Sequence, residues 1–183
     1  MIYGKRIRLR ALERADLPLF VQWFNDPEVH VGIAVFLPMS LSEEERWFER
    51  MLETPAPEHP MMIEVKGDGG WKAIGDCGFH QIDWRNRSGE VGIVIGEKAF
   101  WNQGYGTESM NLLLGHGFNS LNLNRIFLRV YSTNPRAIRS YEKAGFVHEG
   151  RFRQAEFRNG SYEDVLFMSV LRSEWQGANP SNP

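Results

Sequence analysis

The feature that most limits how this chain can fold is a strand, a glycine-rich turn and a helix in direct succession, within VGIVIGEKAFWNQGYGT at residues 91–107. β-Branched residues open the segment, and the helical spacing of apolar residues predicts an amphipathic helix from Thr107 to Leu121. A helix start leaves backbone N–H groups without intrahelical partners and carries partial positive charge. Gly104 and Gly106 lack the Cβ atoms that would keep a ligand off the backbone. The segment therefore predicts a phosphate site.

Hydrophobic periodicity on both sides of this segment predicts an α+β fold. Alternation predicts strands at residues 6–10, 61–66, 71–81, 90–95, 125–131, 146–157 and 162–171. Helical spacing predicts helices at residues 16–24, 42–52, 107–121 and 135–144. We expect a mostly antiparallel central sheet of six to seven strands flanked by about four helices. Only the two strands beside the glycine-loop helix need run parallel, because a right-handed crossover joins them.

Local signals support several of these boundaries. Ser42 and Glu45 have the spacing of a capping box, which predicts a helix start there. Asn134 and Pro135 stand where an N-cap and a first helical residue belong, and a glycine follows the predicted end of that helix. The pair Asn159-Gly160 lies between two alternating runs and predicts a hairpin turn.

Composition limits the function classes. A chain of 183 residues with 42% hydrophobic residues fits one domain, predicted at residues 1–175, with a disordered tail of turn-forming composition at 176–183. A net charge of -2 disfavours nucleic acid as the main ligand. The single cysteine, Cys77, excludes an intrachain disulfide and a multi-cysteine metal site, and the five histidines lack metal spacing. No apolar run approaches the ~20 residues of a membrane span. We expect a cytoplasmic protein without a metal.

The residues of the glycine turn distinguish among three phosphate-binding motifs. A P-loop requires G-x-x-x-x-G-K-[ST], and WNQGYGTES has no lysine in that place. A dinucleotide fingerprint requires an acidic residue ~20 positions on, at the end of the next strand, and RIFLRVYS ends without one. The turn instead matches the form [QR]-x-x-G-x-[GA], which acyl-CoA N-acyltransferases place at a helix start.

Two signatures carry this resemblance. Residues 101–106, WNQGYG, resemble the acyl-CoA loop, with Trp101 where the motif has Gln or Arg. Residues 134–146, NPRAIRSYEKAGF, resemble the second signature N-x-x-[AS]-x-x-x-Y-x-K-x-G-F. With both in order, the chain resembles the GNAT superfamily of acyl-CoA N-acyltransferases from about Ile7 to Leu171. Residues 8–29, RLRALERADLPLFVQWFNDPEV, resemble its branch of ribosomal-protein N-terminal alanine acetyltransferases and spermidine acetyltransferases.

The resemblance implies acetyl-CoA as the acyl donor and names the residues that would bind it. The loop would bind the pyrophosphate mainly through main-chain N–H groups, the preceding strand would pair with the pantetheine arm, and Asn134 and Tyr141 would also contact the cofactor. The implied cofactor-binding residues are Ile93, Val94, Ile95, Trp101, Asn102, Gln103, Gly104, Tyr105, Gly106, Thr107, Asn134 and Tyr141.

Tyr141 is the candidate for the proton that the departing thiolate requires. A phenol has an unperturbed pKa near ~10, so it is protonated at neutral pH, as a donor to sulfur must be. By resemblance, the tyrosine of Y-x-K-x-G-F takes this role in the family. The alternative is a core tyrosine on the inner stripe of a short helix.

Glu90 is the candidate general base, because it begins the strand that leads to the loop and could take a proton from the amine through water. A structural ion pair at the end of the sheet is an equally good interpretation of Glu90. His80, Asp83 and Glu28 are further candidates on the acceptor side.

The predicted function is transfer of an acetyl group from acetyl-CoA to a primary amine. An α-amine, with a pKa of ~7.7 to 8.0, needs less help from a base than a lysine amine at ~10.4, which favours a protein or peptide N terminus as acceptor. A polyamine or other small amine is the alternative. A non-catalytic acyl-CoA-binding module is the second alternative, and the resemblance also makes a homodimer an expectation.

Overall fold

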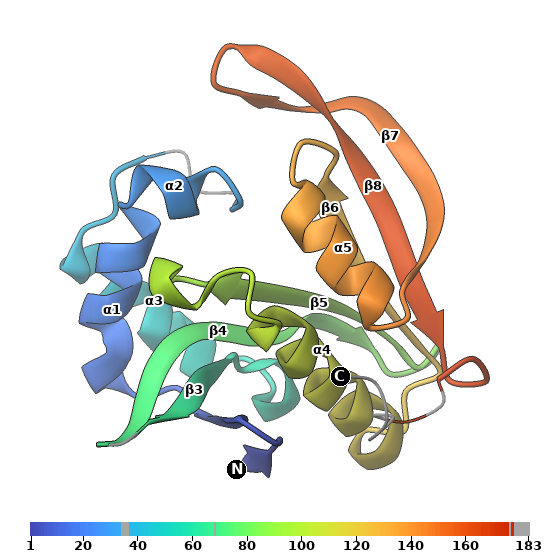
Figure 1. Cartoon of the computed structure of the whole chain (residues 1–183), viewed down its shortest axis with the longest axis horizontal. Coiled ribbons are helices and arrows are strands. Elements are labelled where there is room, and N and C mark those ends of the chain that lie inside the picture. The colour runs from blue at the N-terminus through green and yellow to red at the C-terminus, as the bar shows by residue number, and fades with distance from the viewer. Residues whose placement is uncertain (34–36, 68, 176, 178–183) are drawn as a thin grey trace.

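The computed structural model of the chain describes residues 1–33, 37–67, 69–175 and 177 (Figure 1). Its strands form one sheet in the order β1-β2-β3-β4-β5-β6-β8-β7. Their bounds are β1 (Ile2–Tyr3), β2 (Ile7–Ala11), β3 (Met61–Gly67), β4 (Gly70–Asp83), β5 (Ser88–Ile95), β6 (Arg125–Tyr131), β7 (Val147–Arg158) and β8 (Ser161–Leu171). The helices of the described ranges are α1 (Leu17–Phe24), α2 (Pro27–His30), α3 (Leu41–Leu52), α4 (Tyr105–Gly115) and α5 (Pro135–Lys143).

The predicted α+β class and the predicted strand directions are confirmed. Adjacent strands are antiparallel except β5 and β6, which run parallel and are joined through α4. The sheet has eight strands rather than six or seven because it includes β1, whose two residues are too few to show alternation in sequence. The tail predicted for 176–183 lies outside the described residues, apart from Gly177.

Two helix boundaries differ from the sequence prediction. The glycine-loop helix α4 begins at Tyr105, two residues earlier than predicted, and gives way after Gly115 to a π-helical turn at His116–Ser120. Helix α3 is capped by Ser40 and not by Ser42. The Ser40 hydroxyl accepts a hydrogen bond from the backbone N–H of Glu43, whose carboxylate accepts one from the N–H of Ser40 in return. The sequence contains the same spacing twice, two residues apart, and the earlier copy forms the box.

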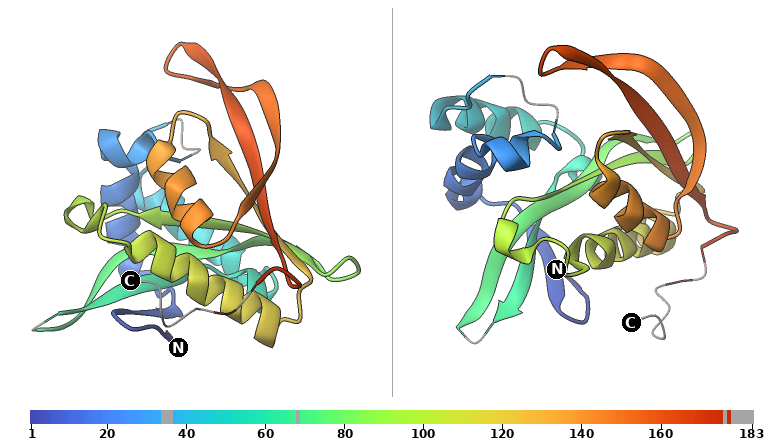
Figure 2. Two further views of the ribbon diagram at one scale, coloured as in Figure 1. Left: turned by 45° about the vertical axis from the view of Figure 1, so that its right-hand side comes forward. Right: turned by 45° about the horizontal axis from the view of Figure 1, so that its top comes forward.

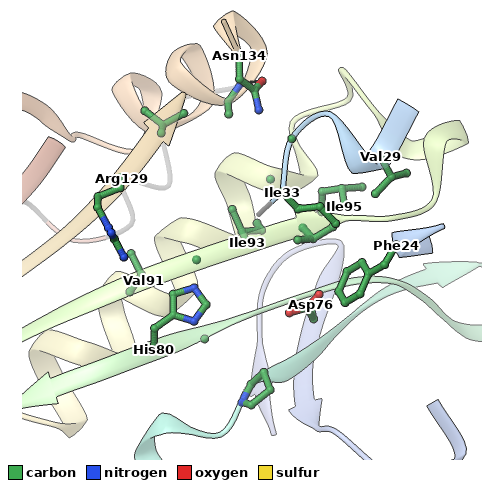
Figure 3. A pocket seen from close by; sticks show the side chains of 18 of the residues that line it. Phe24, Val29, Ile33, Asp76, His80, Val91, Ile93, Ile95, Arg129 and Asn134 are labelled. Atoms are coloured by element: carbon green, nitrogen blue, oxygen red, sulfur yellow. Dashed lines mark hydrogen bonds between the residues drawn. The ribbon is translucent and has the colours of Figure 1, made fainter. Parts of the chain in front are cut away.

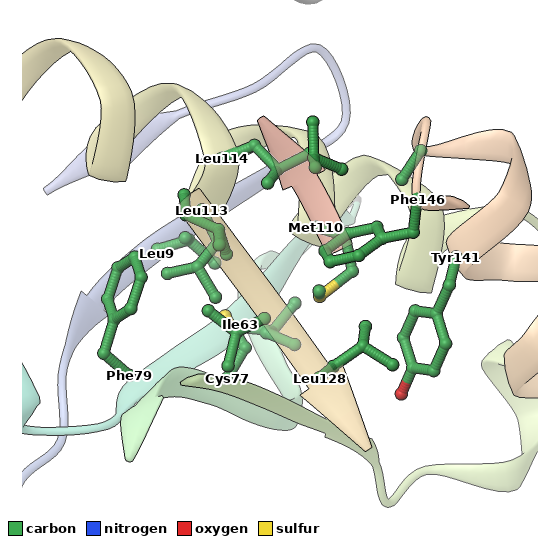
Figure 4. Packing of buried hydrophobic residues seen from close by; sticks show 14 of the residues in the cluster. Leu9, Ile63, Cys77, Phe79, Met110, Leu113, Leu114, Leu128, Tyr141 and Phe146 are labelled. Atoms are coloured by element: carbon green, nitrogen blue, oxygen red, sulfur yellow. The ribbon is translucent and has the colours of Figure 1, made fainter. Parts of the chain in front are cut away.

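Helices cover both faces of the sheet (Figures 1 and 2). On one face α4 buries Met110, Leu113 and Leu114 against strand residues in the larger core, part of which is drawn in Figure 4. On the other face α1 and α3 bury a second cluster, which includes Phe20 and Trp23. Because successive residues of a strand face opposite sides, β3, β4 and β5 supply side chains to both cores.

The sheet opens between β5 and β6. These strands are paired only at Ser88↔Arg125, Gly89↔Ile126 and Glu90↔Phe127. Beyond that point β6 stays paired with β8 along its whole length, while β5 stays with β4. The register between β4 and β5 shifts between Phe79 and Gln81, and a bulge of this kind bends and twists its strand. The residues from Val91 to Ile95 therefore have no β6 partner.

The long β7–β8 hairpin folds back to the loop after α2 (Figure 1). Its turn has Asn159 and Gly160 at positive φ, as the Asn-Gly signal predicted. Arg158, at the end of β7, is 5% exposed and donates hydrogen bonds to the backbone oxygens of His30, Val31 and Ile33. This guanidinium fixes the hairpin against the loop.

Candidate active site

A cleft of about 1200 Å³ follows the opening between β5 and β6. It runs from α1 and α3, past the exposed face of β4 and β5, to the glycine loop and α5. Figure 3 shows part of its lining, with Asp76 and His80 on β4, Ile93 and Ile95 on β5, and Asn134 at the start of α5.

Charge is unevenly distributed along this cleft. Helix α5 contributes three basic side chains and no acidic one to the lining, Arg136, Arg139 and Lys143. The end formed by α3, the turn after it and β4 contributes one basic side chain, Arg50, and four acidic ones, Glu43, Glu44, Glu58 and Asp76. One end of the cleft therefore suits an anion and the other end a cation.

The glycine loop has the geometry of a helix-start anion site. Gly104 is the N-cap of α4 with φ +83°, and Asn102 also has positive φ. The first hydrogen bond of the helix joins the Glu108 N–H to the Gly104 oxygen, so the N–H groups of residues 105–107 precede the intrahelical ladder. Arg6 fixes the loop from outside, donating to the Gln103 oxygen and lying 4.4 Å from the centre of the Tyr105 ring.

Gly106 and Thr107 face a protein neighbour. A Cβ on Gly106 would lie 3.3 Å from the Ser140 hydroxyl of α5, whereas Gly104 needs glycine for its backbone conformation. The Thr107 hydroxyl lies 3.0 Å from the same Ser140 oxygen. The second glycine thus brings α4 and α5 together, and with them the two predicted signatures.

Trp101 packs at the edge of the cleft. Its indole N–H donates to the Ile95 oxygen at 2.6 Å, and the Arg136 guanidinium stacks 3.6 Å from its ring centre. Gln103 is fixed by a hydrogen bond from its amide to the Ala99 oxygen. Trp101 thus joins β5 to α5.

The open edge of β5 lines the middle of the cleft. Ile93 and Ile95 pack against the larger core, and Val94 packs against the cluster under α1 and α3. Because the Ile95 oxygen already accepts from Trp101, a ligand lying beside this strand has the remaining main-chain groups to pair with. Asn134 caps α5 by accepting from the Ala137 N–H, and it also lines the cleft.

Tyr141 reaches the cleft from the larger core. Its side chain packs against Phe146, with ring centres 5.9 Å apart, and the residue is 8% exposed (Figure 4). Burial raises the pKa of the phenol to about 12, so it is protonated at neutral pH. Within the described residues its hydroxyl has no protein hydrogen-bond partner, and it belongs to the lining of the cleft.

Glu90 and His80 lie together where β5 and β6 separate. The Glu90 carboxylate accepts from Arg129 Nε at 2.7 Å, so the ion pair considered in the sequence analysis is present. The His80 ring lies over Gly92, where a Cβ would come within 2.0 Å of its Nε2. The surrounding protein lowers the pKa of His80, the charge of Glu90 opposes that shift and Arg129 adds to it. His80 is therefore a neutral imidazole at neutral pH.

Two other acids named from the sequence lie elsewhere. Asp83 accepts hydrogen bonds from Asn86 in the β4–β5 turn. Glu28 pairs with Lys98 on the surface. Neither belongs to the lining of the cleft.

Residues 6–147 match the acetyltransferase (GNAT) domain family. The chain belongs to the GNAT family. It is 32% identical over 178 residues to an uncharacterized N-acetyltransferase of Bacillus licheniformis, covering 96% of this chain and 98% of that protein. It is also 32% identical to a putative ribosomal N-acetyltransferase of Bacillus subtilis, covering 95% and 96%.

A solved structure supports the same family assignment. The GNAT chain superposes on the crystal structure of spermidine N-acetyltransferase from Vibrio cholerae, in complex with CoA and spermine, with a TM-score of 0.84. The sequence identity is 30%, and the match covers 93% of this chain and 98% of that one. As a GNAT acetyltransferase the protein is an enzyme, and its acyl donor is acetyl-CoA. The sequence-derived family, activity and cofactor are confirmed.

The sequence motifs identified residues near the basic end of the cleft but none at its acidic end. Glu44 and Asp76 were missed as site residues. Asp76 did carry a signal, since it interrupts the otherwise apolar and glycine-rich run AIGDCGF in a predicted strand.

Among the described residues there is no cluster of three or more potential metal ligands, and none of the helices combines the length and apolar character that a bilayer crossing requires.

Proposed function

We propose that this enzyme acetylates a primary amine by direct transfer from acetyl-CoA, with Tyr141 protonating the CoA thiolate. The observation that supports this most directly is that the open edge of β5, the glycine loop and Tyr141 line one cleft. The amine attacks the thioester carbonyl, the C–S bond breaks, and the sulfur takes a proton from the phenol. The raised pKa of Tyr141 suits this donor role.

The cofactor is proposed to lie along the basic half of the cleft. The N–H groups at Gly104, Tyr105, Gly106 and Thr107 would hold the pyrophosphate, with the flanking Trp101, Asn102 and Gln103 shaping the turn. Main-chain groups of Ile93, Val94 and Ile95 would pair with pantetheine, whose arm would also meet Asn134.

We propose that His80 and Glu90 together take the proton that the amine loses. Neutral His80 is the closer match to a base at neutral pH, while Glu90 is held by Arg129 and would act behind it. This gives the site a base and removes the argument that favoured an α-amine acceptor. The acidic end of the cleft favours a polyamine or other small amine over a protein or peptide N terminus.

We propose that the enzyme is located in the cytoplasm and that its minimal assembly is a homodimer.

Steady-state kinetics with acetyl-CoA and a panel of amines test the proposal. A panel of polyamines, monoamines and peptides with free N termini should yield at least one acetylated product. Acetyl-CoA binding without transfer to any amine would instead support the non-catalytic acyl-CoA-binding module. Another structure of the Vibrio cholerae spermidine N-acetyltransferase is dodecameric, so light scattering should accompany the assay.

A further inference from the structure

In the described part of the chain, one buried acid lacks the cation with which two other buried acids are paired. Asp16 and Glu64, which are 7% and 6% exposed, pair with Arg10, at 2.7 Å and 2.8 Å. Glu44 is 3% exposed, and within the described residues its carboxylate has neither an ion pair nor a hydrogen bond. A buried carboxylate without partners costs free energy, so its retention at this position needs an explanation.

A second unpartnered carboxylate lies beside it. Asp76 Oδ1 is buried and has no hydrogen-bond partner among residues 1–33, 37–67, 69–175 and 177. Glu44 on α3 and Asp76 on β4 line the same cleft, and the charge of Glu44 contributes to raising the pKa of Asp76. Both residues line the acidic end of the cleft. Burial raises the pKa of each carboxyl to about 7. The basic residues of the same helix are Arg46 and Arg50, and within the described part of the chain neither forms an ion pair with the two acids.

The surroundings of the pair suit an aliphatic cation. Phe24, Trp47 and Met51 line the same end of the cleft and would contact the methylene groups of a ligand. Asp76 and His80 both lie on β4 and both line the cleft, and their Cα atoms, four residues apart, are at most about 13 Å from each other at about 3.3 Å per residue. A short aliphatic chain can therefore carry one amine to His80 and a second to the two acids.

We propose that Glu44 and Asp76 bind a second ammonium group of the acceptor, and that the acceptor is a small diamine or polyamine. This inference rests on the proposed function, because it assigns the acceptor of the same cleft. The ammonium group would be the positively charged partner that neither carboxylate has among the described residues. The reacting amine would then be the one at the His80 end, held beside the thioester.

Binding measurements test the pair without relying on turnover. Titration calorimetry of the CoA-loaded protein with putrescine and spermidine would compare the wild type with Glu44→Gln and Asp76→Asn. Each variant should weaken diamine binding at least tenfold and leave CoA binding within twofold. Glu45→Gln is the matched control, because Glu45 is exposed on the same helix and outside the cleft. Unchanged diamine affinity in both site variants would overturn the inference.

Kinetics with matched acceptors distinguish this inference from the proposed function. The two variants should raise KM for a diamine at least tenfold and change kcat/KM for a monoamine of equal length by less than twofold. A wild-type enzyme that acetylates peptides and neither binds nor acetylates diamines would refute the small-amine acceptor. If diamine binding depends on Glu44 and Asp76 but no amine is ever acetylated, the binding site stands and the proposed function fails.

Discussion

The two ends of the cleft are built in different ways. The cofactor end uses a helix start and main-chain groups within two short stretches, residues 93–107 and 134–146, where motif spacing is fixed by the local backbone. The acidic end, which we propose binds the acceptor, is assembled from α3, the turn after it and β4. The loop after α2, part of which also lines the cleft, is held by Arg158, 128 positions from His30. Local chain geometry therefore forms the cofactor site, while the proposed acceptor site depends on tertiary packing.

The strongest test of the cofactor end is the replacement Tyr141→Phe. Loss of a general acid lowers rates by roughly 10²–10⁴-fold, so we expect kcat to fall at least a hundredfold. Affinity for acetyl-CoA should change little, because the hydroxyl has no protein partner among the described residues and the ring packing against Phe146 is kept. Stopped-flow rates and calorimetry would measure the two effects separately. An unchanged kcat would exclude Tyr141 as the acid.

The next largest effect is expected for Gly104→Val. The valine would be strained at φ +83°, by roughly 1–3 kcal/mol, and its Cβ would lie 3.4 Å from the Arg6 guanidinium that fixes the loop, so the N–H groups of the loop would shift. We expect acetyl-CoA to bind at least thirtyfold more weakly. Gly160→Val is the matched control, because Gly160 has the same φ in the β7–β8 turn and open space around it. Equal affinities in the two variants would contradict the loop assignment.

The sequence predicted the cofactor end well because its signals are local. The bounds of β6 and the Asn134 cap of α5 agree with the residues expected from alternation and capping. The π-helical end of α4 was missed because its apolar spacing continues smoothly to Leu121. The separation of β5 from β6 depends on a register shift in β4, which periodicity does not report.

The acceptor end escaped prediction for a different reason. Glu44 and Asp76 lie 32 positions apart on a helix and a strand, and each alone reads as an ordinary charged residue. The Glu90–Arg129 pair likewise depends on two parallel strands meeting at one register. Such pairs follow from topology, so they become visible only once the strands are placed.

A smaller effect is expected for Arg158→Lys, which tests whether the hairpin shapes the acceptor end. An ammonium cannot donate in the fork geometry that reaches the oxygens of His30, Val31 and Ile33, and hydrogen bonds to charged groups contribute about 1.5–3 kcal/mol each. Hydrogen exchange should quicken at residues 27–33, and KM for the acceptor should rise severalfold.

Two comparisons complete this test. KM for acetyl-CoA should stay constant in Arg158→Lys, because the guanidinium bonds to the loop after α2 and stacks on Tyr131, and neither contact involves the glycine loop or β5. Arg153→Lys, on an exposed part of β7, should alter neither quantity. A variant that weakened the cofactor and the acceptor alike would show that the hairpin supports the whole cleft, and the contrast between its two ends would be lost.

The smallest expected effect is a change in the pH dependence of stability. The pKa of Glu44 and that of Asp76 are each raised to about 7, from 4.5 and 3.8. In that window the folded protein holds protons that the unfolded chain has released, so the stability contribution of the pair is complete below about pH 4 and is lost as pH rises through about 7. Relative to the wild type, the double variant Glu44→Gln, Asp76→Asn should therefore gain Tm on going from pH 5 to pH 8.

Glu45→Gln removes a charge from the same helix and should show no such gain. If the double variant gained stability at high pH and lost diamine binding, the same two carboxylates would be shown to destabilise the fold and to serve the acceptor, a trade that the cofactor end avoids by using its backbone.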